Sequence, residues 1–175
     1  MKIRSAQGFA MLDLLFVCGI VGILSGMALP RLVSARNSAG AASAIASMRV
    51  INSAQLTFAI TCGNGFYAPN LTSLGKAPAG SNNAFISTDL GSADVVVKSG
   101  FTVQMSGTPF GGAPDTCNAI GAGMAAQAFK AGADPLDASM TRFFAVNAMG
   151  TIYEDTTSLF ATMPEAALPA TGNPL

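Results

Sequence analysis

The stretch Gly8-Phe9-Ala10-Met11-Leu12-Asp13-Leu14-Leu15 opens an apolar run that continues to Leu29, with Asp13 as its one charged residue. About 20 apolar residues are enough for a helix to cross a bilayer. The short segment before this run has basic side chains and no acidic one, which by the positive-inside rule favours a cytoplasmic N-terminus. We therefore expect a single membrane-spanning helix over residues 9–30.

A cleavable secretory signal would place a small-residue site of the A-x-A kind after the apolar run. No such site follows, and the Gly8–Phe9 junction lies before the run instead. A short basic leader, Gly8, Phe9, the acidic Asp13 and then Pro30 together resemble the class III signal of type IV pilins and pseudopilins. The resemblance implies cleavage after Gly8 by a prepilin peptidase, N-methylation of Phe9, and an assembly role for Asp13 where the family has glutamate.

The same resemblance divides the chain into three parts. Residues 1–8 are the cleaved leader, residues 9–30 the transmembrane and filament-core helix, and residues 31–175 the exported pilin-like domain. The precursor is then expected in the inner membrane, and the mature chain in an extracellular pilus or a periplasmic pseudopilus. The implied partners are the prepilin peptidase, the pilus or type II secretion assembly machinery, and copies of the chain itself in a helical filament.

The composition excludes several other functions. Only 10% of the residues are charged, against about 25% in typical globular proteins, and the net charge is zero. A general nucleic-acid-binding surface would need a basic excess. The chain has no histidine, no C-x-x-C pair and no P-loop, so a Ser-His-Asp triad and a histidine-ligated zinc site are excluded. We expect no enzymatic activity, no cofactor and no metal; Asp115, Asp134 and Asp137 lack the spacing of an EF-hand loop.

Small residues recur every four positions within the apolar run, at Cys18, Gly22 and Gly26. This spacing lines one strip of a helix, where a second helix backbone can approach closely. The alternative is that glycine is simply common in membrane helices. Pro30 removes the backbone hydrogen bond to the carbonyl of Gly26, so we expect a kink there.

Residues 31–60 continue the helix with an amphipathic pattern. The expected apolar face consists of Ala41, Ile45, Met48, Leu56 and Ala59, with Ile51 at its edge and Ser43, Ser47 and Ser53 mostly away from it. Gly63-Asn64-Gly65 is expected to end the helix.

The remaining residues predict an α+β fold, in which the long helix packs on a small antiparallel sheet. Strands are expected at 95–97, 101–105, 124–130, 142–146 and 151–153, the last two joined by a four-residue connection at 147–150. A Leu-x-x-Leu turn is expected at 71–74, loops at 76–92 and 106–123, and a tail on the surface or frayed at 164–175. One face of such a sheet packs on the helix and the other is solvated.

Cysteine usage indicates an oxidising compartment. Outside the apolar run the chain has two cysteines, Cys62 and Cys117, which predict a disulfide. Two free thiols are the alternative. Cys18 is expected to be a small packing residue in the bilayer without a disulfide partner.

Three functions remain open. The chain is a subunit of a type IV pilus-like filament, a pseudopilin of a type II secretion system, or a periplasmic domain tethered by a single helix. A tether needs no carboxylate at position 13, which costs about 2.5–3.5 kcal/mol in lipid. This favours the first two functions, and the low charge, the Gly/Ala/Ser-rich exterior and the lack of a calcium motif favour a pilin.

Overall fold

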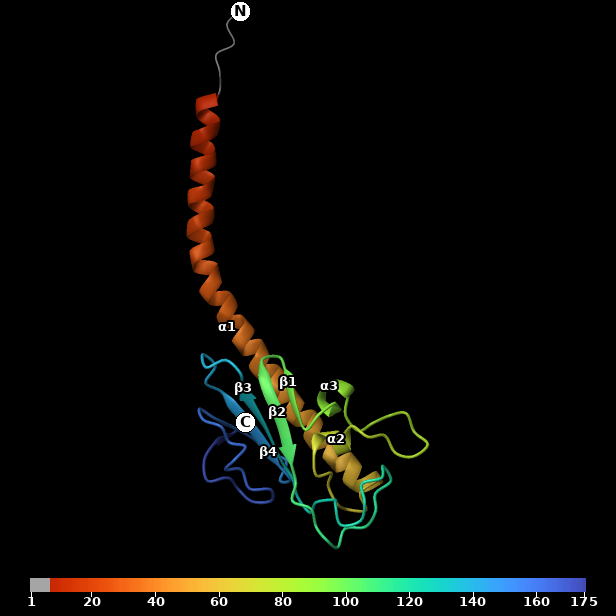
Figure 1. Ribbon diagram of the computed structural model, residues 1–175. Coiled ribbons are helices and arrows are strands. Elements are labelled where there is room, and N and C mark those ends of the chain that lie inside the picture. The colour runs from red at the N-terminus through yellow and green to blue at the C-terminus, as the bar shows by residue number, and fades with distance from the viewer. Residues whose placement is uncertain (1–6) are drawn as a thin grey trace, which may run out of the picture. The chain divides into compact units, whose positions relative to one another are not determined.

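The computed structural model describes the backbone of residues 7–175 and the side chains of residues 11–26 and 31–175. It forms two compact units, Met1–Ala39 and Gly40–Leu175. Helix α1, Gln7–Thr61, contributes to both units (Figure 1). Each unit is described by itself below.

The first unit is built from the N-terminal turns of α1. Every side chain between residues 11 and 26 is exposed. The helix continues through Pro30. Gly8, Phe9 and Pro30, and with them the expected cleavage site and kink, fall outside the residues whose side chains are described.

The second unit packs the rest of α1 on a six-stranded antiparallel sheet with strand order β1-β2-β3-β4-β5-β6 (Figure 1). The predicted α+β fold is confirmed. The strands are β1 Val95–Lys98, β2 Phe101–Ser106, β3 Lys130–Pro135, β4 Phe143–Asn147, β5 Ile152–Asp155 and β6 Asn173–Pro174. Two short helices, α2 Leu71–Leu74 and α3 Thr88–Gly91, lie between α1 and β1.

A buried stripe on α1 forms one side of the core. Its residues recur at intervals of three and four, as one face of a helix requires, and the series continues to the first residue after α1: Ala41, Ala44, Met48, Ile51, Gln55, Phe58 and Cys62. The inner face of the sheet supplies the other side, with Phe101, Val103, Met105, Ala131, Ala133, Phe144 and Val146. Strand β2 alternates buried and half-buried residues along its whole length, as expected of a strand with one face in the core.

The stripe is rotated from the predicted face. Leu56, predicted to be inside, is 45% exposed, whereas Ile51, predicted at the edge, is fully buried. Ser47 was expected outside and is buried, with its hydroxyl donating to the carbonyl of Ser43 at 3.0 Å. The physical reason is that the stripe passes through a polar residue, Gln55, which an apolar pattern counts as outside.

Gln55 is completely buried and its amide is satisfied by one backbone position. Its Nε2 donates to the carbonyl of Ala68 at 2.8 Å, and the N–H of Ala68 donates back to Oε1 at 2.9 Å. Nε2 also lies 3.1 Å from the sulfur of Met105. A buried amide with both ends paired avoids the desolvation cost of a lone polar group. Gln55 thereby fixes the chain that follows α1 against the helix.

The predicted helix stop is confirmed. α1 ends at Thr61, and Asn64 and Gly65 adopt left-handed backbone conformations with φ of 52° and 89°. The N–H of Gly63 donates to the carbonyl of Phe58 at 2.7 Å, and that of Gly65 donates to the carbonyl of Ala59 at 2.9 Å. These bonds use carbonyls that the helix end leaves without partners.

Four of the five predicted strands are confirmed, as β1, β2, β4 and β5, and so is the turn at 71–74, as α2. The connection between β4 and β5 lies at 148–151, one residue later than predicted. The strand predicted at 124–130 is wrong: in that segment Ala126 makes only isolated bridges, to Tyr67 and Pro109, and β3 begins at Lys130. The sequence of β3, Lys-Ala-Gly-Ala-Asp-Pro, is poor in strand-forming residues, and pairing with β2 and β4 on both sides makes it a strand.

The C-terminal segment covers part of the sheet face that was expected to be solvated. Leu159 and Met163 form a second cluster with Ala145 and Tyr153 on that face. Asn147, fully buried, donates from Nδ2 to the carbonyls of Pro164 at 2.8 Å and Ala167 at 2.7 Å. The tail is therefore pinned, and it ends as β6, which pairs with β5. Three elements were missing from the sequence-based prediction: β3 at its observed position, β6, and α3 within the segment 76–92.

Candidate functional site

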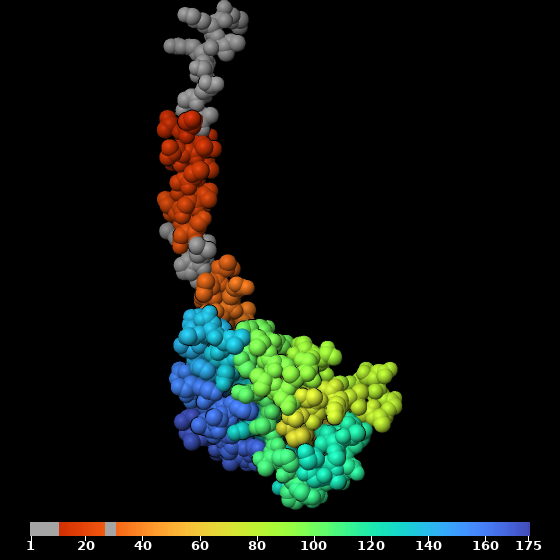
Figure 2. All heavy atoms as spheres, in the orientation of Figure 1, coloured from red at the N-terminus to blue at the C-terminus, as the bar shows by residue number. Residues whose placement is uncertain are grey.

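The most unusual surface of the molecule is the apolar part of α1 between residues 11 and 26 (Figure 2). Its large side chains are mostly more than half exposed; the exposed fractions are 76% for Met11, 74% for Leu15 and 69% for Phe16. Soluble monomers rarely expose a continuous apolar surface of this extent unless it binds something.

The helix over Met11–Thr61 contains an apolar window near its N-terminal end and is long and apolar enough to cross a membrane, by length and composition. None of that apolar window is buried within the chain. The predicted apolar N-terminal helix is thus present, and it has the length of a membrane anchor.

Asp13 lies on this exposed surface as its one charged residue. Among the described residues, its carboxylate takes part in no hydrogen bond and no salt bridge. A carboxylate surrounded by apolar side chains needs a cationic or hydrogen-bonding partner when the surface is removed from water. The described residues supply no such partner to Asp13 in this structure.

The small-residue strip of Cys18, Gly22 and Gly26 is open in the single chain. A Cβ atom added at Gly22 or Gly26 would meet nothing within 4 Å, and Cys18 is an exposed free thiol. Gly40, in the second unit, differs: a Cβ there would lie 2.9 Å from the carbonyl oxygen of Ser99. Close packing at a glycine of α1 thus occurs inside the second unit and not along the strip.

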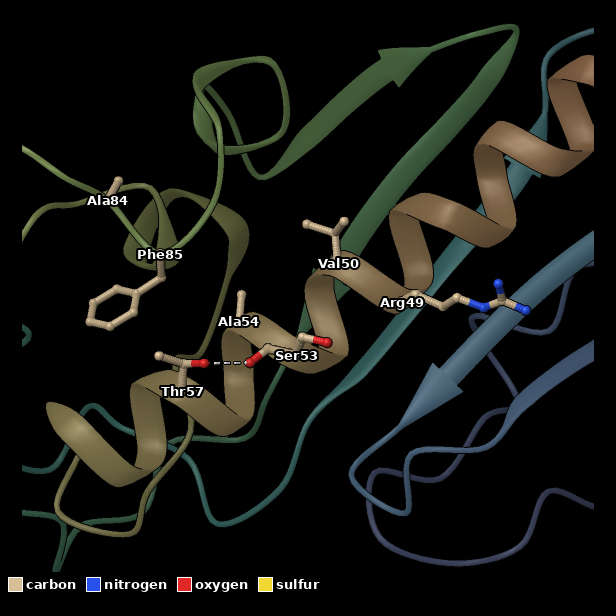
Figure 3. A pocket seen from close by; sticks show the side chains of 7 residues that line it. All are labelled: Arg49, Val50, Ser53, Ala54, Thr57, Ala84 and Phe85. Carbon is tan, nitrogen blue, oxygen red and sulfur yellow. Dashed lines mark hydrogen bonds between the residues drawn. The ribbon is translucent and has the colours of Figure 1, made fainter.

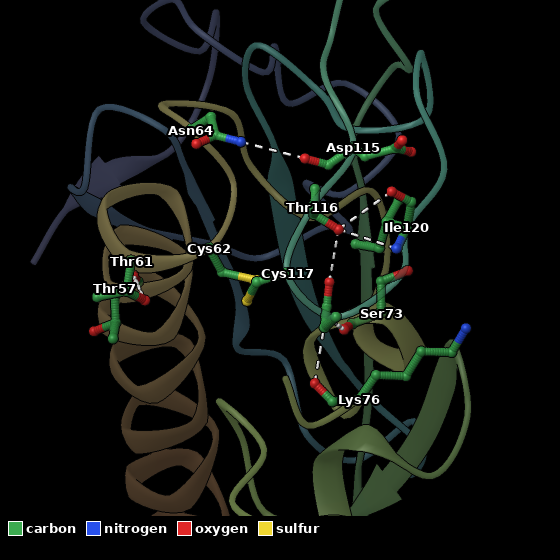
Figure 4. The surroundings of a disulfide bond; sticks show 11 residues. Thr57, Thr61, Cys62, Asn64, Ser73, Lys76, Asp115, Thr116, Cys117 and Ile120 are labelled. Carbon is green, nitrogen blue, oxygen red and sulfur yellow. Dashed lines mark hydrogen bonds between the residues drawn. A yellow bond between two sulfur atoms is a disulfide. The ribbon is translucent and has the colours of Figure 1, made fainter. Parts of the chain in front are cut away.

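The disulfide predicted between Cys62 and Cys117 is present, with the two Cα atoms 4.9 Å apart (Figure 4). The N–H of Cys117 also donates to the carbonyl of Cys62 at 3.2 Å. Beside the bridge, Asn118 donates from Nδ2 to the carbonyl of Ser73 at 2.8 Å. The bridge joins cysteines 55 positions apart and ties the 106–123 loop to the end of α1. Chain-entropy arguments put the stabilisation of the folded state by such a crosslink at about 4 kcal/mol.

A shallow groove of about 440 Å³ runs along the outer side of α1 in the second unit (Figure 3). Its lining is Arg49, Val50, Ser53, Ala54, Thr57, Ala84 and Phe85. Phe85 is held in place by an edge-on contact with Phe58, with ring centroids 5.2 Å apart. The hydroxyl of Thr57 donates to the carbonyl of Ser53 at 2.9 Å. Arg49 is the one charged residue of the lining.

The carboxylates are dispersed in the described part of the chain, which contains no cluster of three metal-ligating side chains. Asp134 accepts a hydrogen bond from the hydroxyl of Ser158 at 2.6 Å, and Asp137 accepts one from the N–H of Ser139 at 2.8 Å. Asp115 has its backbone carbonyl bonded to the amide of Asn64. Each of the three acids considered for calcium therefore has its own local environment.

Two ion pairs lie at the surface of the second unit, Lys98–Asp89 and Arg142–Glu154. The ammonium of Lys98 lowers the pKa of Asp89, and the hydroxyl of Ser87 lowers it further. The guanidinium of Arg142, which donates to both oxygens of Glu154, lowers the pKa of that carboxyl, and Glu154 in turn raises the pKa of Arg142.

Comparisons with protein-family models, with curated proteins and with solved structures found no match to this chain. What the chain does must therefore be inferred from its own residues and from the exposed helix.

Proposed function

We propose that this protein is a structural subunit of a type IV pilus-like extracellular filament. The observation that carries the proposal is the contrast within α1. Residues 11–26 expose an apolar surface that no described part of the chain covers, whereas the same helix from Gly40 onward is built into a folded, disulfide-linked unit. A bundle of identical helices gives the first part the cover that the second part finds within its own chain.

The signal-like sequence at Gly8-Phe9 supports the proposal, because its resemblance implies a processing step that releases a helix with a free amine at Phe9. Asp13 lies one helical turn beyond that amine. Pairing the amine of one subunit with Asp13 of a neighbour would satisfy two charges that are costly in an apolar bundle. The same pair would set the axial position of one subunit against the next.

The strip of Cys18, Gly22 and Gly26 supports close approach of neighbouring helices, since a Cβ at either glycine meets nothing in the single chain. A pseudopilin of a type II secretion system would use the same architecture in a periplasmic filament. A tethered periplasmic domain would use the helix as an anchor alone.

The test is to shear surface filaments from cells that produce the chain, examine them by electron microscopy, and measure the intact mass of the subunit. We expect filaments whose subunit begins at N-methylated Phe9. Filaments containing a chain that begins at Met1 would contradict the processing step. A processed chain confined to the periplasm would indicate the pseudopilin, and one found only in the inner membrane would indicate the tether.

A substitution at Gly8 tests the processing step alone. A bulky side chain there should block entry of the backbone into the peptidase site, so that Gly8→Leu leaves full-length precursor in the inner membrane. Gly19→Leu is the matched control, because Gly19 also lies in α1 with nothing within 4 Å of an added Cβ, but lies beyond the cleavage site.

Asp13→Ala tests the assembly role. The variant should still insert, because it loses a charge that opposes insertion. It should yield few filaments, whereas Asp13→Glu, which keeps the charge, should yield them. A normal yield of filaments from Asp13→Ala would show that assembly does not depend on this carboxylate.

A further inference from the structure

The groove on the second unit lacks an occupant in the single chain. Its lining is largely apolar or small, Arg49 is the one charged residue among those that line it, and Val50 beside it is 45% exposed. Figure 3 shows Arg49 at the end of the groove away from Phe85, with Val50 and Ala54 between them and with the guanidinium extending away from these three side chains. In the described part of the chain, no carboxylate forms an ion pair with Arg49. The groove therefore suits an anionic group followed by apolar side chains.

A surface with that chemistry lies elsewhere on the same chain. Asp13 is the only acidic residue of α1, and residues three, four and seven positions further on share its face of the helix: Phe16, Val17 and Ile20. Those three side chains are exposed. Along α1 the groove presents the opposite charge at Arg49 and then apolar side chains at Val50 and Ala54, with the small polar Ser53 and Thr57 beside them, over about two helical turns.

We propose that the groove binds the Asp13 turn of a second copy of this chain, with Arg49 donating to the Asp13 carboxylate. The inference rests on the proposed function and adds the contact between the apolar helix of one subunit and the exported unit of another. Asp13 and Arg49 belong to one uninterrupted helix, and residues of one helix contact each other when they are three or four positions apart. The two residues are separated by far more than that along α1, so we assign the pair to two copies of the chain.

The pair is compatible with an amine partner for Asp13. A carboxylate has two oxygens and about four lone-pair sites, so it can accept from a guanidinium and an amine together. Arg49 is singled out among the arginines of α1 because it lines the groove, whereas Arg31 and Arg36 do not. Burying Asp13 against the groove also covers Phe16 and Val17, which water would otherwise contact.

Zero-length crosslinking tests the contact directly. Arg49→Lys keeps the positive charge and supplies an amine that a carbodiimide joins to a carboxylate as an amide. Isotopically light and heavy full-length chains carrying Arg49→Lys are co-expressed, crosslinked in intact membranes and in sheared filaments, and digested for mass spectrometry. We expect a peptide pair linking positions 13 and 49 with mixed light and heavy halves. Arg36→Lys, on the same helix outside the groove, should give no link to position 13.

A charge reversal gives a second readout that needs no crosslink. Arg49→Glu places a carboxylate against the proposed Asp13 site and should lower filament yield by about tenfold or more. The matched change Arg36→Glu should leave the yield within about twofold of the unchanged chain. Both side chains are exposed, so neither change should prevent folding of the second unit.

The outcomes separate this contact from the filament proposal. Filaments of normal yield from Arg49→Glu, or the absence of a link between 13 and 49 in filaments that do form, would overturn the contact and leave the filament standing. A mixed link found in membranes of cells that form no filament would support the contact and contradict the filament. A link with two halves from the same chain would overturn the inference that two copies are needed.

Discussion

Two parts of one helix meet opposite conditions in this molecule. Between residues 11 and 26, α1 exposes apolar side chains all around its circumference. Between Ala41 and Cys62, it buries a stripe against the sheet and exposes the rest. The apolar side chains of the first part find no cover in the described chain.

The difference shows where stability and assembly reside. The stripe from Ala41 to Cys62 belongs to a core completed by the sheet, so the second unit has a hydrophobic core of its own. The apolar turns of the first unit contribute nothing to that core. No described residue of the chain buries them, so substitutions in the two parts should produce different defects.

The largest difference in the effect of a substitution on stability is expected between two phenylalanines of α1. Phe58 is completely buried, whereas Phe16 is 69% exposed. Phe58→Ala should lower the free energy of unfolding of the second unit by about 3–5 kcal/mol, because it leaves a cavity in the core. Phe16→Ala should change it by less than about 0.5 kcal/mol. Denaturant unfolding of the full chain in detergent measures both; equal effects would mean that the two parts of α1 do not differ as described.

The disulfide tests whether the second unit is stabilised independently of the apolar helix. Replacing Cys62 and Cys117 together with alanine should lower the free energy of unfolding by about 2–4 kcal/mol. The same replacement of Cys18, an exposed free thiol, should leave that free energy unchanged. Non-reducing peptide mapping provides the check on the bridge, and finding both thiols free in the exported protein would contradict it.

Glycine substitutions give a smaller effect and separate folding from assembly. Gly40→Leu should destabilise the second unit by about 1–3 kcal/mol, because its Cβ would lie 2.9 Å from the carbonyl of Ser99 and 3.3 Å from the ring of Phe101. Gly22→Leu should leave the unfolding transition unchanged, because its Cβ meets nothing in the single chain. It should reduce filament yield, because a large side chain there would keep a neighbouring helix from approaching closely. Normal filaments from both Gly22→Leu and Gly26→Leu would contradict close packing along the strip.

The smallest effect is a pH dependence confined to the second unit. Arg142 lowers the pKa of Glu154 below its ordinary value of 4.5, so the ion pair stabilises the fold above that pH. The contribution is lost as the pH falls through the lowered pKa, when Glu154 is protonated in the folded state. Because Arg142 is 48% exposed, the effect should be about 0.2–1 kcal/mol and smaller in high salt. Glu154→Gln should remove this part of the pH dependence in acid unfolding curves, and an unchanged curve would count against the pair.

Most elements of the fold were predictable from short stretches of sequence, because a few neighbouring residues determine each helix end, turn or strand. Gly63-Asn64-Gly65 ends α1 where left-handed conformations are required, and the alternation in β2 follows from one buried face. The disulfide followed from having two cysteines outside the apolar run.

The errors arose where contacts distant in sequence decide the structure. β3 is a strand because β2 and β4 pair with it, which its Ala, Gly and Pro residues do not reveal. The buried stripe was misplaced because Gln55 is buried through the backbone of Ala68, 13 residues away. The groove around Arg49 also had no signal in the sequence, since Ala84 and Phe85 reach α1 through a loop. Arg49 by itself reads as an ordinary exposed residue.

The central claim is that the apolar turns of α1 are covered by other copies of the chain in a filament. Cys18, an exposed free thiol in those turns, reports this directly. Its rate of labelling by N-ethylmaleimide is compared between sheared filaments and the same protein dissociated in detergent. We predict labelling of the dissociated chain and protection of Cys18 in filaments by about tenfold or more, since helix packing along the strip excludes the reagent. Equal labelling rates in the two states would contradict the claim.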